Sequence, residues 1–281
     1  MDITAFFDSL DHSRLRRILD QRVRDGVLRR TIDKWLAAGV LEGGELSHPD
    51  AGTPQGGVVS PCLANVYLHD ALDVWFEKEV RPRLFGRAFM VRFADDAVMV
   101  FSNEKDARRV MEVLPKRLGS YGLTLHPTKT RLLHFRPPSA GGEQPRASGK
   151  RSFDFLGFTH HWVRSRRGLW VVKRKTASSR FSRALKRASE WFRSVRHRPV
   201  AWQHQKLVLK LRGHNNYYGI AGNSEALCRF LYEVRRLWRK WLDRRSHKAR
   251  MGWARFQRLQ VRYPLPRPVV RRGLGHCAAN P

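Results

Sequence analysis

The sequence of 281 residues is poor in cysteine and has no long apolar run. Its three cysteines, Cys62, Cys228 and Cys277, are far apart and odd in number. This excludes a disulfide framework, and no Cys-x-x-Cys pair supports a zinc site. No run approaches the length of a membrane span, and the start carries no cleavable signal pattern. We therefore expect a protein with no membrane partner in a reducing compartment, such as a bacterial cytoplasm.

Acidic residues are scarce: 24 Asp and Glu stand against 55 Lys and Arg, which gives a formal net charge of +31. The imbalance lies in the second half, because residues 1–150 hold 23 basic and 19 acidic residues and residues 151–281 hold 32 and 5. A polyanion, usually nucleic acid, is the partner that best neutralises such charge. The distribution favours chemistry in the first half and binding of a polyanion in the second.

Local patterns predict a mixed first half and a helical second half. A strand end at residues 2–8 and a helix capped by Asp11 or Ser13 open the chain. The other expected elements are a helix from Ser60-Pro61 with Ser60 as its cap, a hairpin of Phe89–Ala94 and Ala97–Phe101, a helix over Glu104–Tyr121, a strand at Leu132–Phe135, a linker at 137–150, a hairpin from Phe153 that packs on the first domain, and helices from Thr176. Apolar residues recur at three- and four-residue steps from Leu227 to Leu242, which predicts a helix with one buried and one basic face.

Two adjacent aspartates, Asp95 and Asp96, occupy the tip of the first hairpin. Like charges repel there, and a tight hairpin turn favours Asn-Gly or Asp-Gly. A cation shared with a third carboxylate would remove the difficulty, and Asp2 is the best distant candidate. Two Mg²⁺ ions held by such carboxylates can activate an attacking hydroxyl and stabilise a leaving pyrophosphate. For the dipeptide alone, a solvated Asp-Asp turn is the simpler interpretation.

Five segments, in order along the chain, carry a resemblance to a known family. They are Asp2–Asp8, Thr53–Asn65, Phe93–Asp96, Leu125–Thr130 and Phe155–Phe158. Together they resemble the motifs of reverse transcriptases, in the form found in group II intron-encoded enzymes. Retron-type enzymes are similar around the aspartates but usually differ after the Gln-Gly pair.

The resemblance implies roles for the residues around the aspartates. Asp2 and Asp95 would bind two Mg²⁺ ions with help from the backbone carbonyl of Ile3, and Asp96 would complete the charge. The remaining nucleotide-binding candidates are Phe7 under the sugar of the incoming nucleotide, Gln55 and Gly56 against the nucleotide and template base, and Lys129 near the nucleotide or primer. Phe7 could instead be a core aromatic residue and Lys129 a solvated lysine.

The second half resembles the maturase thumb of the same family, most clearly at Leu211–Asn223. Arginine, asparagine and tyrosine on one segment suit RNA, because they offer charge neutralisation, hydrogen bonds and stacking faces. The candidate RNA-binding residues are Arg212, Asn215, Tyr217, Tyr218, Arg235 and Arg239. A helix end with tyrosines in the core is an equally good interpretation of the spacing. The segment Tyr263–Pro268 resembles the end of relatives that have no nuclease module.

The expected fold is an α/β (α+β) polymerase palm with a mostly antiparallel sheet over residues 1–172, followed by an α-helical thumb over residues 173–281. The expected function is RNA-directed DNA polymerisation coupled to binding and splicing of an intron RNA. Its partners would be intron RNA, a template-primer, a DNA primer or target, and dNTPs. The alternatives are a non-catalytic RNA-binding splicing factor and a reverse transcriptase of a diversity-generating or CRISPR-associated system.

The sequence departs from the family at its start. Relatives carry a fingers region upstream, which a separate polypeptide could supply here. Asp2 is expected to lie on an untethered terminus, where fraying costs little. We therefore expect the isolated chain to bind RNA but to polymerise poorly.

Overall fold

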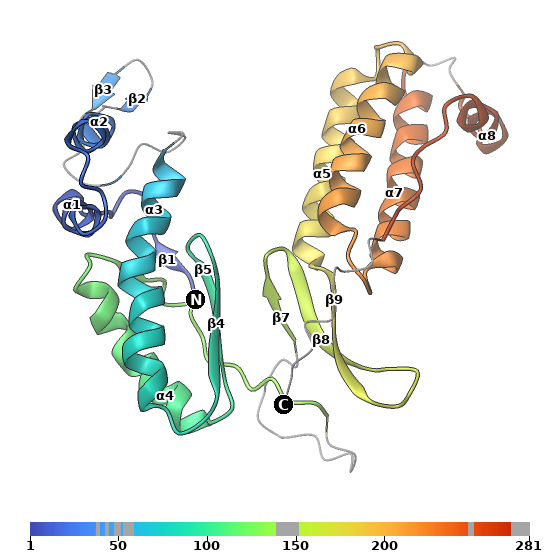
Figure 1. The fold of residues 1–281 in the computed structure, drawn as a ribbon. Helices are drawn as coiled ribbons and strands as arrows, with labels where there is room; N and C mark the ends of the chain where they lie inside the picture. Colours follow the sequence, from blue (N-terminus) through green and yellow to red (C-terminus); the bar gives the residue numbers. More distant parts are fainter. Residues whose placement is uncertain are drawn as a thin grey trace. The chain divides into compact units, whose positions relative to one another are not determined.

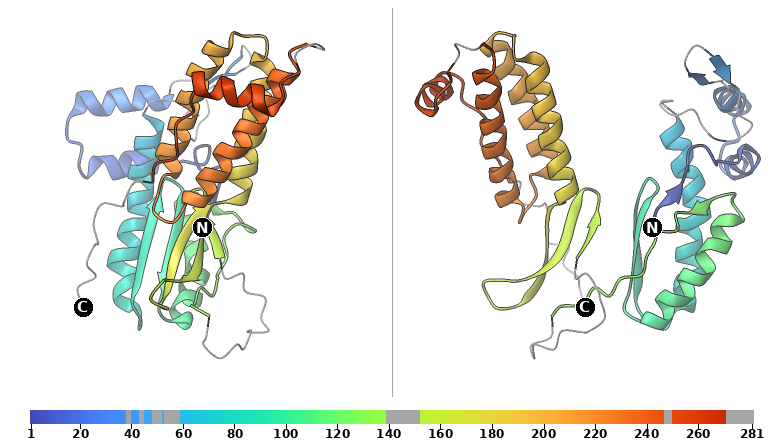
Figure 2. Two further views of the ribbon diagram at one scale, coloured as in Figure 1. Left: turned by 90° about the vertical axis from the view of Figure 1, so that its right-hand side faces the viewer. Right: turned by 180° about the vertical axis from the view of Figure 1, so that it is seen from behind.

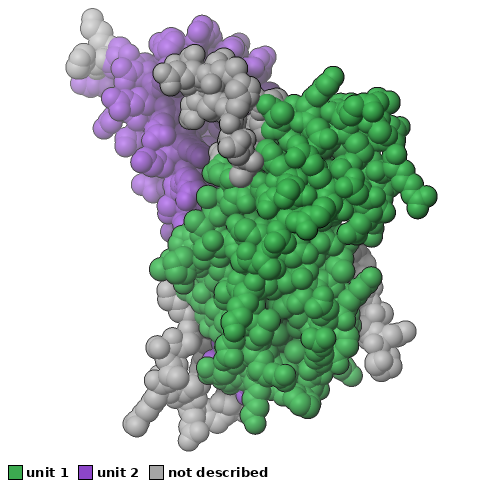
Figure 3. Space-filling view, turned by 90° about the vertical axis from the view of Figure 1, so that its left-hand side faces the viewer, with its two compact units in different colours: residues 1–133 green, residues 134–281 purple. Residues whose placement is uncertain are grey.

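A computed structural model describes residues 1–37, 40–42, 45–47, 52, 59–138, 152–246 and 250–270. The chain divides into two compact units, residues 1–133 and residues 134–281, each with its own core (Figure 3). None of the described helices combines the length and the hydropathy that a bilayer-spanning segment needs.

The first unit mixes short strands with helices. Its elements are β1 (Ile3–Thr4), α1 (His12–Asp20), α2 (Gly26–Ala37), β2 (Val40–Glu42), β3 (Glu45–Ser47), α3 (Ser60–Leu68), the π-helical segments η1 (His69–Val74) and η2 (Phe76–Val80), the short 3₁₀ helix η3 (Arg81–Arg83), β4 (Ala88–Phe93), β5 (Asp96–Phe101), α4 (Glu104–Gly119) and β6 (Thr124–Leu125). β4 and β5 pair antiparallel, and the continuous helical segment α3–η2 and α4 lie along one face of this hairpin (Figure 1).

Alternation along β4 explains why the hairpin has one covered face. Met90 packs against the core, whereas Phe89, Val91 and Phe93 are 55%, 49% and 65% exposed. Successive side chains of a strand point to opposite faces, so the helices cover only the Met90 face.

Capping residues define two of the helix starts in this unit. The side chain of Asp11 accepts hydrogen bonds from the backbone N–H groups of Ser13 and Arg14, so Asp11 is the cap of α1 as the sequence indicates. The expected cap at Ser60 is wrong. Ser60 is already the first residue of α3, and Val59 precedes it without a capping side chain. The proline at position 61 fits the first turn because a helix leaves that N–H unpaired anyway.

The second unit joins a three-stranded sheet to a helical bundle. Its elements are β7 (Ser152–Phe155), β8 (Phe158–Arg164), β9 (Trp170–Thr176), α5 (Ser178–Val195), α6 (Val200–Tyr218), α7 (Ser224–Asp243) and α8 (Trp253–Arg262). The sheet is antiparallel in the order β7-β8-β9, and α5, α6 and α7 run alongside one another (Figure 2). The bundle core is formed by Phe192, Leu207, Leu211, Phe230, Val234, Trp238 and Leu242. The amphipathic helix predicted from Leu227 to Leu242 is confirmed.

A tight turn joins β8 to β9 at residues 165–169. The N–H of Leu169 donates to the hydroxyl of Ser165 (3.1 Å), and the N–H of Gly168 donates to the carbonyl of Ser165 (3.0 Å). Gly168 has a φ of +75°, and a Cβ built there would meet no atom within 4 Å. The turn is thus closed by hydrogen bonds between its own residues.

Two expectations about the middle of the chain need correction. Residues 132–135 form no strand; the ring of Phe135 instead packs on Phe153 and Trp162, at centroid distances of 5.0 and 5.3 Å. The hairpin from Phe153 does form, but it groups with the helices that follow it, and the second compact unit begins at residue 134. The functional boundary after residue 172 stays a prediction.

Candidate active site

The turn between β4 and β5 presents the two aspartates as the hairpin pattern predicts. Phe93 and Asp96 form the closing pair of the ladder, so Ala94 and Asp95 are the turn residues. Ala94 has a φ of +52°, a left-handed conformation that is unfavourable for a residue with a Cβ. Asp95 is half-buried and Asp96 exposed. The tip therefore combines backbone strain with two adjacent negative charges, and such strain clusters at functional sites.

Asp2 is fixed beside this tip by backbone pairing on both sides. The N–H group of Met1 donates to the carbonyl of Ala97 (2.9 Å), and the N–H of Ala97 donates back to the carbonyl of Met1 (3.4 Å). Two residues that exchange both bonds are an antiparallel pair, so the next residues, Asp2 and Asp96, are neighbours across the strands. On the other side, the N–H of His126 donates to the carbonyl of Asp2 (2.9 Å).

This pairing corrects the expectation that Asp2 lies on an untethered terminus. Directly after Asp2, β1 pairs antiparallel with β6, so that Ile3 lies opposite Leu125. Backbone hydrogen bonds thus link β4, β5, the start of the chain and β6 in that order. Bonds to residues far along the chain hold the first residues in place, which the sequence could not show.

Lys129 lies directly against the first aspartate. Its Nζ is 2.7 Å from Oδ2 of Asp2. Burial lowers the pKa of the Met1 ammonium group, and the nearby carboxylates of Asp96 and Asp2 partly offset this effect. Lys129 therefore places a cationic group against the carboxylate of Asp2.

The oxygen donors at this site suit a hard divalent cation, because Mg²⁺ prefers carboxylate and carbonyl ligands. Within the described residues, however, no three His, Cys, Asp or Glu side chains converge on one point in this conformation. Lys129 occupies one oxygen of Asp2. The residue types at this site fit a divalent cation, and Lys129 pairs with the carboxylate of Asp2 in this structure.

Gly52 lies against the backbone of the segment that carries Phe7. Its N–H donates to the carbonyl of Leu10 (2.8 Å), and its φ is +91°. A Cβ at this position would lie 2.8 Å from the carbonyl oxygen of Phe7 and 2.9 Å from Cα of Asp8. Only glycine fits there. Phe7 itself is half-buried, with its ring centroid 5.4 Å from that of Phe6. Gln55 and Gly56 lie outside the described residues.

Sequence reasoning missed Arg92, whose side chain donates a hydrogen bond to the turn. Its Nε and Nη2 donate to the two oxygens of Asp73 (2.7 and 2.6 Å). Its Nη1 donates to Oδ1 of Asn65 and to the carbonyl of Ala94, both at 2.9 Å. An arginine inside an otherwise apolar strand was the available signal, since a buried guanidinium needs partners.

In the second unit, the structure brings together two predicted segments that are about 60 residues apart. The hydroxyl of Tyr217 donates to the carbonyl of Leu156 (3.0 Å), and its ring stacks on Phe158 with 5.9 Å between centroids. Leu156 and Gly157 form the β7–β8 turn with φ values of +49° and +79°. Tyr218 also contacts Phe158, edge to face. Tyr217 remains 56% exposed, so it can hold the turn and still offer a stacking face.

The other RNA-binding candidates lie in two groups. Arg212 is exposed and Asn215 half-buried near the end of α6. On α7, Arg235 donates to Gln260, and Arg239 donates to the carbonyl of Met251 (2.9 Å) and lies 4.5 Å from the ring centroid of Trp253. These two arginines therefore bind the α8 region.

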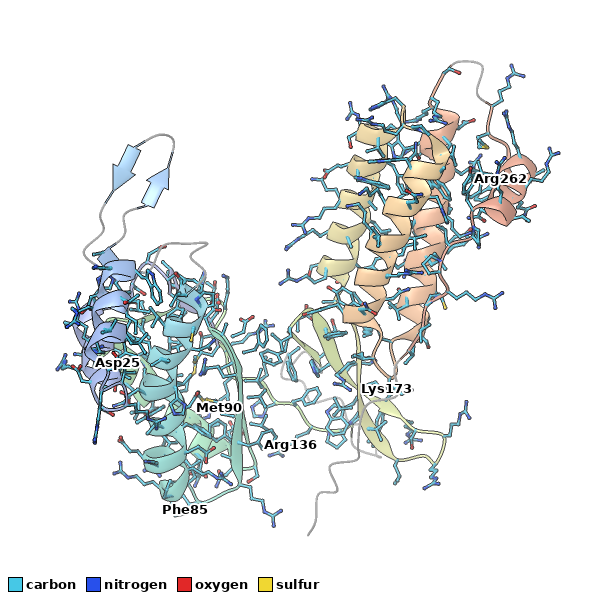
Figure 4. All side chains as sticks on the ribbon, turned by 45° about the horizontal axis from the view of Figure 1, so that its top comes forward. Asp25, Phe85, Met90, Arg136, Lys173 and Arg262 are labelled. Carbon is cyan, nitrogen blue, oxygen red and sulfur yellow. The ribbon has the colours of Figure 1, made fainter. Side chains whose placement is uncertain are left out.

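Contacts between α6 and α7 show where the two groups of RNA-binding candidates lie along the helix pair. His214 stacks on Phe230 and Gln203 accepts from Trp238, so the two helices run antiparallel. The candidates on α6 lie toward one end of the pair, and those on α7 toward the other. Many further nitrogen-tipped side chains project from the helices of this unit (Figure 4).

Comparison with known proteins bears on the family of the chain. Residues 1–160 match the family described as "Reverse transcriptase (RNA-dependent DNA polymerase)". The group II intron-encoded protein LtrA of Lactococcus lactis subsp. cremoris is 42% identical over 89 residues, which are 30% of this chain and 15% of LtrA. Protein YkfC of Escherichia coli is 27% identical, over 47% of this chain and 42% of that protein. The COX1/OXI3 intron 2 protein of Saccharomyces cerevisiae is 24% identical, over 83% of this chain and 31% of that protein.

The family match covers more than half of the chain, so the chain belongs to the reverse transcriptase family. Its relatives include proteins encoded by introns, and the predicted likeness to group II intron reverse transcriptases and maturases is confirmed. Reverse transcriptases generally use a divalent metal and bind RNA and DNA. The chain spans less than half the length of each of these relatives.

Proposed function

We propose that this chain is an RNA-directed DNA polymerase of the group II intron type that transfers nucleotides by a two-metal mechanism and also binds and helps to splice an intron RNA. The observation that carries the proposal is the backbone pairing of Met1 with Ala97, which makes Asp2 and Asp96 neighbours beside the strained turn. In this proposal residues 1–172 are the palm and residues 173–281 are the thumb.

The carboxylates of Asp2 and Asp95, with the carbonyl of Ile3, would hold two Mg²⁺ ions, and Asp96 would add negative charge. When bound, this pair activates the primer hydroxyl and stabilises the leaving pyrophosphate. The Nζ of Lys129, 2.7 Å from Asp2, neutralises that carboxylate beforehand. Once released from Asp2, the same ammonium group can bind a phosphate of the incoming dNTP.

Phe7 would lie under the sugar of the nucleotide and exclude a 2′-hydroxyl. Gly52 supports this assignment, because it fixes the backbone of residues 7 and 8 against the chain that leads to Gln55 and Gly56. Those two residues would contact the nucleotide and the template base.

The second unit would bind the RNA partners, intron RNA and template-primer, and a DNA primer or target. Its charge supports the assignment, because residues 151–281 hold 32 basic residues against 5 acidic ones. Arg212, Asn215, Tyr217 and Tyr218 would contact RNA, with Tyr217 offering its exposed ring face. Arg235 and Arg239 would add positive charge from α7 while they hold α8.

The test is primer extension on an RNA template with Mg²⁺ and dNTPs. The purified chain is compared with Asp95→Ala/Asp96→Ala and with Glu112→Ala, an exposed acidic position on α4 that serves as a control. Extension by the wild type and the control, lost in the double variant, supports the polymerase.

Absence of extension from all three proteins would refute polymerisation by this chain on its own. Tight RNA binding that weakens steeply with salt would in that case support the second candidate, a non-catalytic RNA-binding splicing factor. The +27 charge of the second half favours this candidate independently of the aspartates.

A further inference from the structure

We propose that Arg92 is a positioning residue that sets the orientation of Asp95 through the carbonyl group of Ala94, with Asp73 and Asn65 fixing its guanidinium. The proposal rests on the polymerase function proposed above and assigns to it a residue that the motifs do not mark. Arg92 lies on β4 two residues before Ala94, and its side chain is 12% exposed.

The guanidinium group of Arg92 is held rigidly. Asp73 binds it with two parallel bonds of 2.7 and 2.6 Å, a geometry that fixes both the position and the plane of the group. Asn65 accepts a third bond at 2.9 Å. Asp73 and Asn65 lie on the continuous helical segment α3–η2, so the guanidinium is anchored outside the hairpin that it contacts.

The same guanidinium group contacts the turn. Nη1 of Arg92 donates to the carbonyl of Ala94 at 2.9 Å. Ala94 holds a φ of +52°, which an alanine adopts only when other contacts outweigh the steric cost. The peptide group that carries this carbonyl also carries the N–H of Asp95. Fixing the carbonyl therefore fixes the direction in which the chain enters Asp95.

Arg92 acts on the turn through its geometry and not through its charge. The carboxylate of Asp73 already neutralises the guanidinium at hydrogen-bond distance, so Arg92 is not the counter-ion of Asp95. Its contribution is the placement of the turn, which demands the planar fork of arginine. A lysine keeps the charge and could pair with Asp73, but it cannot make two parallel bonds to that carboxylate and also reach Asn65 and Ala94.

The experiment uses the intact chain and three variants: Arg92→Lys, Asp73→Asn and Arg108→Lys. Arg108 is the matched control, because it also pairs with a carboxylate, that of Glu104, but on the exposed face of α4. Hydrogen exchange is followed by mass spectrometry on peptides that cover residues 89–101. The affinity for Mn²⁺ is measured by titration, and primer extension gives kcat and the KM for dNTP.

We expect Arg92→Lys and Asp73→Asn to accelerate exchange selectively at the turn and to weaken Mn²⁺ binding by about tenfold, as loss of a supporting hydrogen bond does at metal sites. Arg108→Lys should leave both unchanged. In primer extension, kcat should fall by about tenfold or more with little change in KM, since the nucleotide-binding residues are untouched.

Two results would overturn the proposal: turn exchange in Arg92→Lys within twofold of the wild type, or acceleration spread evenly over the whole first unit, which would mark a purely structural role. The readouts also separate this proposal from the polymerase itself. Faster turn exchange without any extension by the wild type would refute polymerisation by this chain on its own and leave the placement of the turn by Arg92 intact. Extension at an unchanged kcat by Arg92→Lys would refute the positioning alone.

Discussion

Replacing the buried glutamine Gln203 by leucine should destabilise the helical bundle of the second unit more than any surface change. Gln203 is 1% exposed on α6. Its Nε2 donates to the carbonyls of Val195 and Arg198 near the end of α5, both at 3.0 Å, and its Oε1 accepts from Nε1 of Trp238 (3.0 Å). The Gln203 side chain thus binds carbonyl groups at the end of α5 and also accepts the indole hydrogen bond from α7.

The size of the loss in the free energy of unfolding follows from the polar groups that Gln203→Leu leaves without partners. Trp238 is 0% exposed, so its N–H loses its acceptor where water cannot replace it. A buried unpaired donor costs about 1–3 kcal/mol. The carbonyls at the end of α5 are less affected, because Arg245 donates to Arg196 (2.6 Å) and to Arg198. We expect a total loss of about 2–4 kcal/mol in the free energy of unfolding.

Thermal unfolding measures this loss directly. For a unit of this size, about 1 kcal/mol corresponds to 2–4 °C, so Tm should fall by roughly 5–15 °C. Seven of the nine tryptophans belong to residues 134–281, so intrinsic fluorescence follows the second unit. Gln205→Leu is the matched control: the same substitution two residues along α6 at an exposed position, with an expected change within about 0.5 kcal/mol. Equal Tm values for the two variants would refute the reasoning.

Three further predictions concern other buried or site residues. Asn223→Ala should lower the free energy of unfolding by about 2–4 kcal/mol. The side chain of Asn223 accepts from the backbone N–H of Thr176 (2.8 Å) and donates to the carbonyl of Tyr218 (2.8 Å), and alanine can do neither. Urea unfolding measures the loss, and a midpoint equal to that of the wild type would contradict this prediction. Burial lowers the pKa of His214 to about 4 from 6.5, so the folded state should lose about 2–3 kcal/mol as pH falls from 6.5 to 4 and retain full stability above 6.5. The unfolding midpoint should depend less on pH between 6.5 and 4 in His214→Phe than in the wild type. An equal pH dependence in the two proteins would show that His214 is not the group responsible. Phe7→Ala should raise incorporation of ribonucleotides relative to deoxyribonucleotides about tenfold or more in primer extension, whereas an unchanged ratio would remove Phe7 from the sugar site.

Features with a local cause could be predicted from the sequence. The hairpin around Asp95 and Asp96 follows from two short apolar runs, and the α1 cap follows from Asp11 before a helical pattern. The buried stripe of α7 follows from a 3.6-residue period. In each case the residues that determine the structure are neighbours in the chain.

Features that depend on distant partners could not be predicted. The tether of Asp2 depends on Ala97 and His126, and neither position carries a sequence signal for that contact. The absence of a strand at residues 132–135 has the same origin, because an apolar run becomes a strand only where another backbone pairs with it. Arg92 was overlooked because its partners lie 19 and 27 residues away.

The turn between β8 and β9 gives the second unit a natural attachment point for a spectroscopic label. Arg167 is exposed in that turn, and hydrogen bonds within residues 165–169 close it. A cysteine at position 167, in a background where Cys62, Cys228 and Cys277 are replaced by serine, would accept a fluorophore without disturbing the helical bundle. Its emission would then report when a nucleic acid reaches this sheet.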